Sequence, residues 1–168
     1  MSLSGGAAYN NATLDRNFCG TDQDTGQLIQ TCSSSDAVAA KGARLPYTPE
    51  FKGYVTARYT MPIMDWNAYG QVSATYQTSN HVGLRTSDDQ ELGVMPSYGT
   101  VDLSAGASRH GVTFELAVKN LTDSRGQENR FTTCPVQLCS STISQAPHSV
   151  YVTPIVPRTI VFKVEQKF

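Results

Sequence analysis

The residues of this sequence whose type and spacing most clearly indicate a chemical role are its four cysteines. Twelve residues lie between Cys19 and Cys32, and four lie between Cys134 and Cys139, in stretches rich in Ser, Thr, Gln and Asp. Zinc sites usually space their cysteines by about two to four residues and add a second pair or histidines. Cys134 and Cys139 could supply half of such a site, but Cys19 and Cys32 are too widely spaced for the other half. The spacing favours two local disulfides, each worth about 3 kcal/mol at most, and an oxidising compartment such as the cell surface or periplasm.

The remaining candidates for chemistry are isolated from one another along the chain. His81, His110 and His148 have no second His or Cys at metal-ligand spacing, although His81 and His148 fall in expected loops and could contact a ligand. The acidic run at residues 88–91 lacks the alternating spacing of a calcium loop. No G-x-S-x-G element and no phosphate-binding loop occurs. We therefore expect no catalytic residues, no cofactor, no metal site and no enzymatic activity.

Length and charge set the class of protein. The 168 residues include 13 Lys and Arg against 14 Asp and Glu, which gives a formal net charge of −1. This length suits one domain, and the near-neutral balance argues against nucleic acid, whose partners present a basic face. No apolar run reaches the roughly 18 residues that a membrane helix needs. A membrane β-barrel stays open as an interpretation, because its strands alternate in polarity.

The hydrophobic pattern has a period of two, which is typical of β-strands. In residues 51–61, Val55, Ala57 and Tyr59 share one face, and Lys52, Thr56 and Arg58 share the other. The same alternation recurs along the chain, so we predict an all-β, antiparallel up-and-down meander of about six strands. The expected strands cover residues 4–18 (weakly), 51–61, 66–77, 100–108, 112–121 and 159–168.

The connections between these strands alternate in length. Short turns fall near residues 62–66 and 108–112, and long polar loops fall at roughly 19–43, 79–95 and 123–155. Long loops on one side and short turns on the other are typical of a membrane barrel. Aromatic residues near strand ends, such as Tyr59, Trp66 and Tyr76, fit interfacial girdles. A soluble β-sandwich also alternates its faces, so both folds remain open on this pattern.

The two faces of the expected sheet would meet different surroundings in a barrel. The apolar face carries Val, Ala, Leu, Gly and Phe and would face hydrocarbon. Charged residues fall on the polar face and would line the lumen: Lys52, Arg58, Asp102, Glu115, Lys119, Lys163, Glu165 and Lys167.

Several segments resemble one family, the TonB-dependent outer-membrane receptors. Residues 114–123, FELAVKNLTD, resemble its strand followed by Asn-Leu-x-Asp, Pro157-Arg158-Thr159 is similar to its lead-in to the last strand, and residues 45–51, LPYTPEF, resemble a recurrent strand entry. The alternation of Ile160, Phe162 and Val164 towards the terminal Phe168 is similar to the signal read by the barrel assembly machinery. Gln166 departs from that signal, since an apolar residue is usual there.

The resemblance implies that residues 4–168 are the C-terminal part of a larger barrel of about 22 strands, with Met1 to Leu3 as candidates for cloning additions. Such a receptor stands in the outer membrane of a Gram-negative bacterium. It takes up a scarce solute (an iron–siderophore, vitamin B12 or an oligosaccharide), with energy relayed through TonB to a plug that this chain lacks.

The expected partners follow from that architecture. They are the outer-membrane lipid, the plug and remaining strands, TonB through the plug, the barrel assembly machinery and a small ligand at the outer loops. The other membrane interpretation is a complete barrel of about eight strands. The count of about six expected strands argues against it. The alternative from another class is a secreted soluble β-sandwich that binds carbohydrate or a protein partner.

Overall fold

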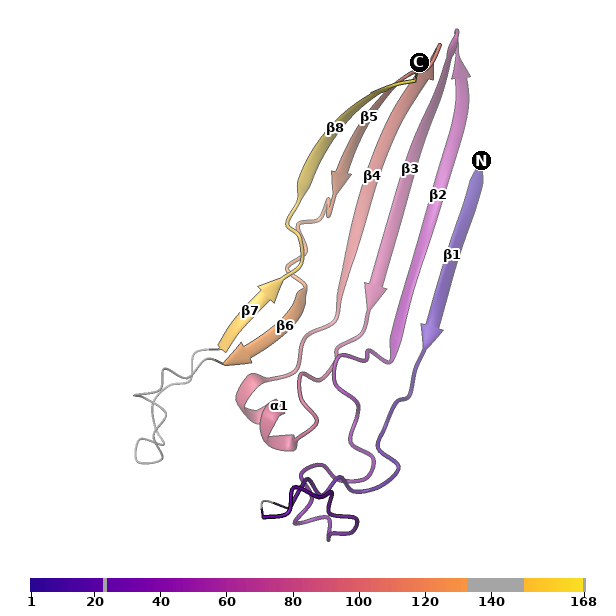
Figure 1. Cartoon of the computed structure of the whole chain (residues 1–168). Helices are drawn as coiled ribbons and strands as arrows, with labels where there is room; N and C mark the ends of the chain where they lie inside the picture. The colour runs from indigo at the N-terminus through magenta and orange to yellow at the C-terminus, as the bar shows by residue number, and fades with distance from the viewer. Residues whose placement is uncertain (23, 133–149, 168) are drawn as a thin grey trace.

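The computed structural model describes residues 1–22, 24–132 and 150–167, and its main element is one open antiparallel sheet (Figure 1). The sheet has six strands in the order β1-β2-β3-β4-β5-β8, and β6 and β7 form a separate two-stranded ribbon. The elements are β1 (Ser2–Tyr9), β2 (Phe51–Ile63), β3 (Trp66–Gln77), α1 (Thr86–Leu92), β4 (Tyr98–Arg109), β5 (Val112–Lys119), β6 (Gln127–Thr132), β7 (Val150–Pro154) and β8 (Thr159–Gln166). The expected all-β meander of about six strands is confirmed.

The register keeps most of the apolar residues on one face of the sheet. Val55 pairs with Ala74, which pairs with Val101, and the same parity holds from β1 to β8. Since side chains alternate between faces along a strand, a consistent register gives one continuous apolar surface and one polar surface. Gln166 falls on the apolar face opposite Val112, so its departure from the apolar pattern is a real break in that surface.

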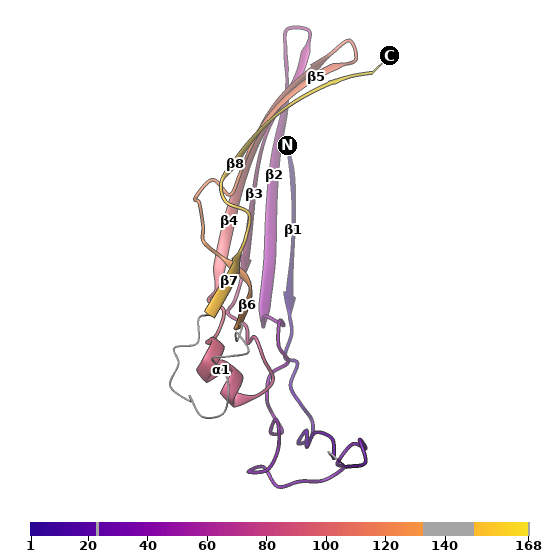
Figure 2. The same cartoon turned by 60° about the vertical axis from the view of Figure 1, so that its left-hand side comes forward.

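The apolar face is open in the part of the chain that the structure describes. The exposed fractions are 47% for Val55, 40% for Val72, 39% for Leu103 and 67% for Phe162. Seen from the side, the six strands form a single curved layer with no second sheet over it (Figure 2). A β-sandwich buries such residues between two sheets about 10 Å apart, so the sandwich interpretation is wrong for this chain.

Two tight turns join the strands at one end of the sheet, at the top of Figure 1. Met64 (φ +52°) lies in the β2–β3 turn, and His110 (φ +48°) and Gly111 (φ +82°) form the β4–β5 turn. Positive φ at these positions matches the right-handed twist of the flanking strands. Arg109 Nη2 donates to Asp65 Oδ2 at 2.9 Å and ties one turn to the other. We call this end the short-turn end and the opposite one the long-loop end.

Some elements at the long-loop end differ from the expectation. The first strand ends at Tyr9 rather than residue 18, and only isolated bridges, such as Thr13 with Arg44, continue the pairing. Ser2 and Leu3 are part of this strand and pair with Arg58 and Ala57. The helix α1 and the ribbon β6–β7 lie within stretches expected to be loops. In the described residues no helix combines the length and apolar character needed to cross a bilayer.

Candidate functional site

A linked set of side chains covers the polar face towards the short-turn end. Tyr69 Oη donates to Glu115 Oε2 at 2.8 Å, although β4 lies between their strands. The guanidinium of Arg58 lies 3.6 Å from the centre of the Tyr69 ring, in cation–π geometry. Lys163 Nζ donates to Glu165 Oε2 at 2.9 Å. The charged groups of this half of the face therefore satisfy one another.

Gly106 is the reason that Tyr69 can cross β4. A Cβ at Gly106 would lie 2.6 Å from Tyr69 Cε1 and 2.9 Å from the carbonyl oxygen of Phe114. Only a residue without a side chain leaves the ring room to lie flat over the strand and reach Glu115. The glycine and the tyrosine thus act as one unit, which pins three neighbouring strands on the polar face.

We expect Gly106→Ala to lower the free energy of unfolding by about 1–3 kcal/mol, because the added methyl displaces the Tyr69 ring. The midpoint of thermal unfolding of the complete receptor in detergent measures the loss. Gly70→Ala is the matched control, since a Cβ at Gly70 would meet no atom within 4 Å. Equal effects of the two substitutions would contradict a role for the crossing ring.

The polar face has a hollow of about 410 Å³ towards the long-loop end. Its polar lining includes Lys52, Thr75, Tyr98, Asp102, Lys119 and Glu128. Glu128 comes from the ribbon β6–β7, and the other five come from the main sheet. Within the described residues the side chains of Lys52, Lys119 and Glu128 form no ion pair and no hydrogen bond. These three charged groups therefore have no partner within the described part of the chain.

The Tyr98 ring has a fixed place in this hollow. A Cβ at Gly126 would lie 2.5 Å from Tyr98 Cγ, so the ring packs directly on the backbone of Gly126. The contact resembles that of Tyr69 on Gly106, but here the glycine follows β5 and leads into the ribbon. One face of the ring is covered by this contact, and the ring forms part of the wall of the hollow.

Asn120 organises the junction between the sheet and the ribbon. Its side chain is buried (4% exposed) and donates from Nδ2 to the carbonyl oxygens of Ser124 and Val156, each at 3.0 Å. Its Oδ1 accepts from the Ser124 N–H at 2.9 Å, and its own N–H donates to Asp102 Oδ1 at 2.8 Å. The residue adopts φ +49°, which Asn tolerates better than most residues. Asn120 thus joins β4, β5 and the approach to β8.

Asp123 completes the junction from the other end of the Asn-Leu-Thr-Asp motif. Its Oδ1 accepts from the Arg158 N–H at 3.2 Å, and Oδ2 accepts from Arg125 Nη2 at 2.9 Å. The backbone N–H of Arg158 is the main cause that lowers the pKa of the Asp123 carboxyl, since it stabilises the charged form. The two motifs at residues 120–123 and 157–159 are therefore halves of one hydrogen-bonded joint.

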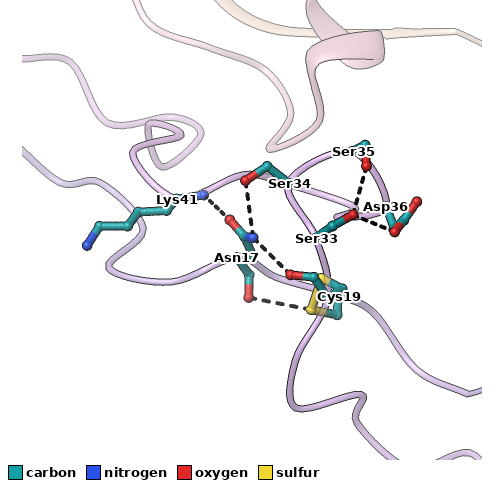
Figure 3. Close-up of a disulfide and its surroundings, with 8 residues drawn as sticks. Asn17, Cys19, Ser33, Ser34, Ser35, Asp36 and Lys41 are labelled. Atoms are coloured by element: carbon teal, nitrogen blue, oxygen red, sulfur yellow. Dashed lines mark hydrogen bonds between the residues drawn. A yellow bond between two sulfur atoms is a disulfide. The ribbon is translucent and has the colours of Figure 1, made fainter.

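The first long loop is closed by a disulfide between Cys19 and Cys32, whose Cα atoms lie 5.7 Å apart. Figure 3 shows Asn17 beside it, where Asn17 Nδ2 donates to the Cys32 carbonyl oxygen at 3.2 Å and Oδ1 accepts from the Lys41 N–H at 2.8 Å. Inside the closed loop, Asp22 Oδ1 accepts from the Thr25 N–H, which lowers the pKa of this carboxyl. The expected Cys19–Cys32 disulfide is confirmed, and Cys134 and Cys139 lie outside the described residues.

Removing this disulfide should loosen the loop and leave the sheet intact. The double substitution of Cys19 and Cys32 by Ser is expected to cost about 3 kcal/mol at most and to speed protease cleavage within residues 19–32 by tenfold or more. Mass spectrometry of the fragments locates the cuts. The matched control is Ser33→Ala, which removes a hydroxyl beside the loop without opening it. Cleavage spreading into β2 and β3 would show that the disulfide supports more than its own loop.

The long connections are joined to one another at this end of the molecule. His81 Nδ1 and Asp89 Oδ2 lie 2.6 Å apart within the second loop, where Met95 is buried. The backbone N–H of Tyr47 donates to the His81 carbonyl oxygen, and the Tyr47 hydroxyl donates to Asn129 Oδ1 at 2.7 Å. His81 therefore serves packing between loops, and His110 lies in the β4–β5 turn, while His148 lies outside the described residues. Among the described residues no cluster of three or more His, Cys, Asp or Glu side chains could hold a metal ion.

The structure divides the charged residues predicted for the lumen into two groups. Seven of the eight lie within strands, on the polar face: Lys52, Arg58, Asp102, Glu115, Lys119, Lys163 and Glu165. Lys167, the eighth, follows the end of β8. Four of the seven belong to the linked set near the short-turn end, and Lys52, Asp102 and Lys119 line the hollow. Ile160, Phe162 and Val164 share the apolar face, and Phe168 lies outside the described residues. Tyr69, Tyr98 and Glu128 were missed, because their contacts depend on register and on the ribbon.

Comparison with known proteins identifies a family. The family model described as TonB dependent receptor-like, beta-barrel matches residues 1–121. A search of curated proteins found no match, and neither did a search of solved structures. The matched part covers most of the chain, from β1 to the first residues of the Asn-Leu-Thr-Asp motif. With its open meander of antiparallel strands, this chain belongs to the TonB-dependent receptor-like β-barrel family.

Proposed function

We propose that this chain forms part of the wall of an outer-membrane receptor, with its apolar face in hydrocarbon. The spacing of two aromatic levels on that face carries the proposal. Trp66 and Tyr76 lie ten residues apart on β3, which is roughly 33 Å along the strand. At a tilt of about 40° this becomes about 25 Å along the membrane normal, the height of the apolar band in outer-membrane barrels.

Other strands of the sheet, β5 and β2, supply a second aromatic residue at each level. The Phe114 ring lies 6.0 Å from that of Trp66, and the Phe51 ring lies 6.4 Å from that of Tyr76. Tyr59 lies on the same face four residues from the end of β2, so it belongs to neither level, contrary to its expected place near a strand end. The two pairs mark interfaces on either side of the bilayer.

The lengths of the connections give the wall its orientation. Outer-membrane barrels have short periplasmic turns and long extracellular loops, so the short-turn end of this sheet faces the periplasm. The long loops then stand outside the cell, where the Cys19–Cys32 disulfide meets oxidising conditions. In this orientation the hollow on the polar face opens beneath the outer loops.

The family supports a transport function for the complete receptor. We propose that it takes up a scarce solute, an iron–siderophore, vitamin B12 or an oligosaccharide, with energy relayed through TonB to a plug inside the barrel. This chain would contribute wall strands, outer loops and contacts to the plug, and it would catalyse no reaction. The outer membrane of a Gram-negative bacterium is the proposed location, with the barrel assembly machinery as a transient partner.

Epitope insertion into the complete receptor tests this orientation. A tag between Thr25 and Gly26 should bind antibody on whole cells, whereas a tag between Met64 and Asp65 should bind only after the outer membrane is opened. Uptake of the solute should stop when TonB is removed. Recovery of the protein in the soluble periplasmic fraction, or equal labelling of both tags on whole cells, would refute the proposal.

A further inference from the structure

We propose that the hollow on the polar face is a subsite for a neutral, polyhydroxylated solute of the oligosaccharide class. This inference rests on the proposed transport function and narrows its choice of solutes. Two positive groups, Lys52 and Lys119, and two negative groups, Asp102 and Glu128, line the hollow, so their formal charges cancel. An anionic iron chelate would meet two carboxylates as well as two ammonium groups there, so the hollow offers it no net electrostatic attraction.

The arrangement of the polar groups suits hydroxyl groups, which both donate and accept hydrogen bonds. The Lys52 and Lys119 ammonium groups can donate, and the Glu128 carboxylate can accept, because none of these three is engaged within the described residues. Asp102 already accepts from the Asn120 N–H at 2.8 Å and keeps its second oxygen for another donor. Charged partners form the stronger hydrogen bonds to neutral groups.

The Tyr98 ring supplies the apolar part of the subsite. Sugar rings present a C–H face between their hydroxyl groups, and such a face packs well on a flat aromatic ring. Tyr98 is pre-positioned because its ring is held against Gly126, so little side-chain entropy is lost on binding. The hollow of about 410 Å³ also falls within the range of roughly 300–1,000 Å³ common for small-molecule sites.

The contrast within the polar face explains why the subsite lies here. Towards the short-turn end, Arg58, Tyr69 and Glu115 satisfy one another and Lys163 pairs with Glu165. A ligand there would have to break existing interactions and would lose their free energy. Around the hollow, Lys52, Lys119 and Glu128 form no ion pair and no hydrogen bond within the described residues, so a ligand gains contacts to them without breaking existing ones.

Binding to the purified complete receptor tests the inference. The probes are neutral glucose and N-acetylglucosamine oligomers, a ferric catecholate chelate and cyanocobalamin, each measured by titration calorimetry. We expect a neutral oligomer to bind. Tyr98→Leu and Lys119→Met should each weaken its binding tenfold or more, which is about 1.4 kcal/mol. Tyr98→Phe, which keeps the ring, should weaken binding less than Tyr98→Leu does. Lys163→Met, which lies outside the hollow on the same face, should leave binding unchanged.

The outcomes separate this inference from the proposed function. Binding of the chelate or cyanocobalamin instead of any oligomer, with the receptor still surface-exposed and dependent on TonB, would overturn the sugar subsite and leave the transport function standing. Oligomer binding that is unaffected by Tyr98→Leu and Lys119→Met would also overturn it. A protein found outside the outer membrane would refute the transport function itself. Normal heat-modifiable gel mobility of each variant excludes misfolding as the cause of a loss.

Discussion

Replacing Leu103 by Arg should destabilise the receptor by about 2–4 kcal/mol, the cost of a cationic side chain near the middle of the bilayer on the lipid face of a barrel. Leu103 lies in the middle of β4 and pairs with Val72, which stands between the two aromatic levels of β3. The substitution places a guanidinium in hydrocarbon, where water cannot solvate it. The shift in urea midpoint for the receptor in phospholipid vesicles measures the loss.

The neighbouring residue supplies the control for this prediction. Ser104 lies on the polar face, so Ser104→Arg should change stability by no more than about 0.5 kcal/mol, as surface substitutions usually do. Introducing Arg at position 103 and at position 104 should therefore change the stability by different amounts. Equal effects at positions 103 and 104 would mean that both faces meet the same solvent, which would remove the basis of the membrane assignment.

The second large effect is expected at Asn120. Asn120→Ala removes three side-chain hydrogen bonds at a buried position, at about 1 kcal/mol each, for a total of about 3 kcal/mol. Alanine also adopts φ +49° less readily than Asn, which adds to the loss. Thermal unfolding followed by gel mobility measures the total, and hydrogen exchange at the Ser124 amide reports the joint itself.

Two further substitutions separate the causes. Asn120→Gly loses the same hydrogen bonds but tolerates the backbone conformation, so it should be less destabilising than Asn120→Ala by about 1 kcal/mol. Asn67→Ala is the control, because the Asn67 side chain forms no hydrogen bond with the described residues and lies on the polar face of β3. If Asn120→Ala leaves exchange at Ser124 unchanged, Asn120 does not hold the joint.

The strands of the main sheet could be predicted because one face is apolar and the other is polar along their length. Residues 66–77 alternate without a break, and the observed strand has the same bounds. The ribbon β6–β7 could not be predicted in this way. Its sequences, QENRFT and VYVTP, are short and carry no clear alternation, and their pairing depends on the joint at Asn120. The short helix α1 likewise depends on the packing of its loop against the ribbon, which Arg130 holds through the Val94 carbonyl oxygen.

The charged residues of the candidate site could be assigned to a face from parity alone, but their grouping could not. Lys52 and Lys119 lie far apart in sequence and come to one hollow only through the pairing of four strands. The Tyr69 contact with Glu115 needs a glycine at position 106, between two strands, and this relation is invisible without the register. The Asn-Leu-Thr-Asp motif could be noticed, but its role as a joint requires the partner carbonyl of Val156.

The sheet ends in two strands, β1 and β8, each with one edge unpaired in the described part of the chain. These two edges differ in how strongly they specify the register of an added strand. β8 carries large alternating side chains, so a one-residue slip would turn Phe162 to the wrong side, whereas β1 reads Ser-Leu-Ser-Gly-Gly-Ala-Ala-Tyr and loses little on slipping. Without the adjacent strands of the barrel, this sheet would therefore pair with other copies through β1 in many registers. Misassembly should begin at the unpaired edge of β1.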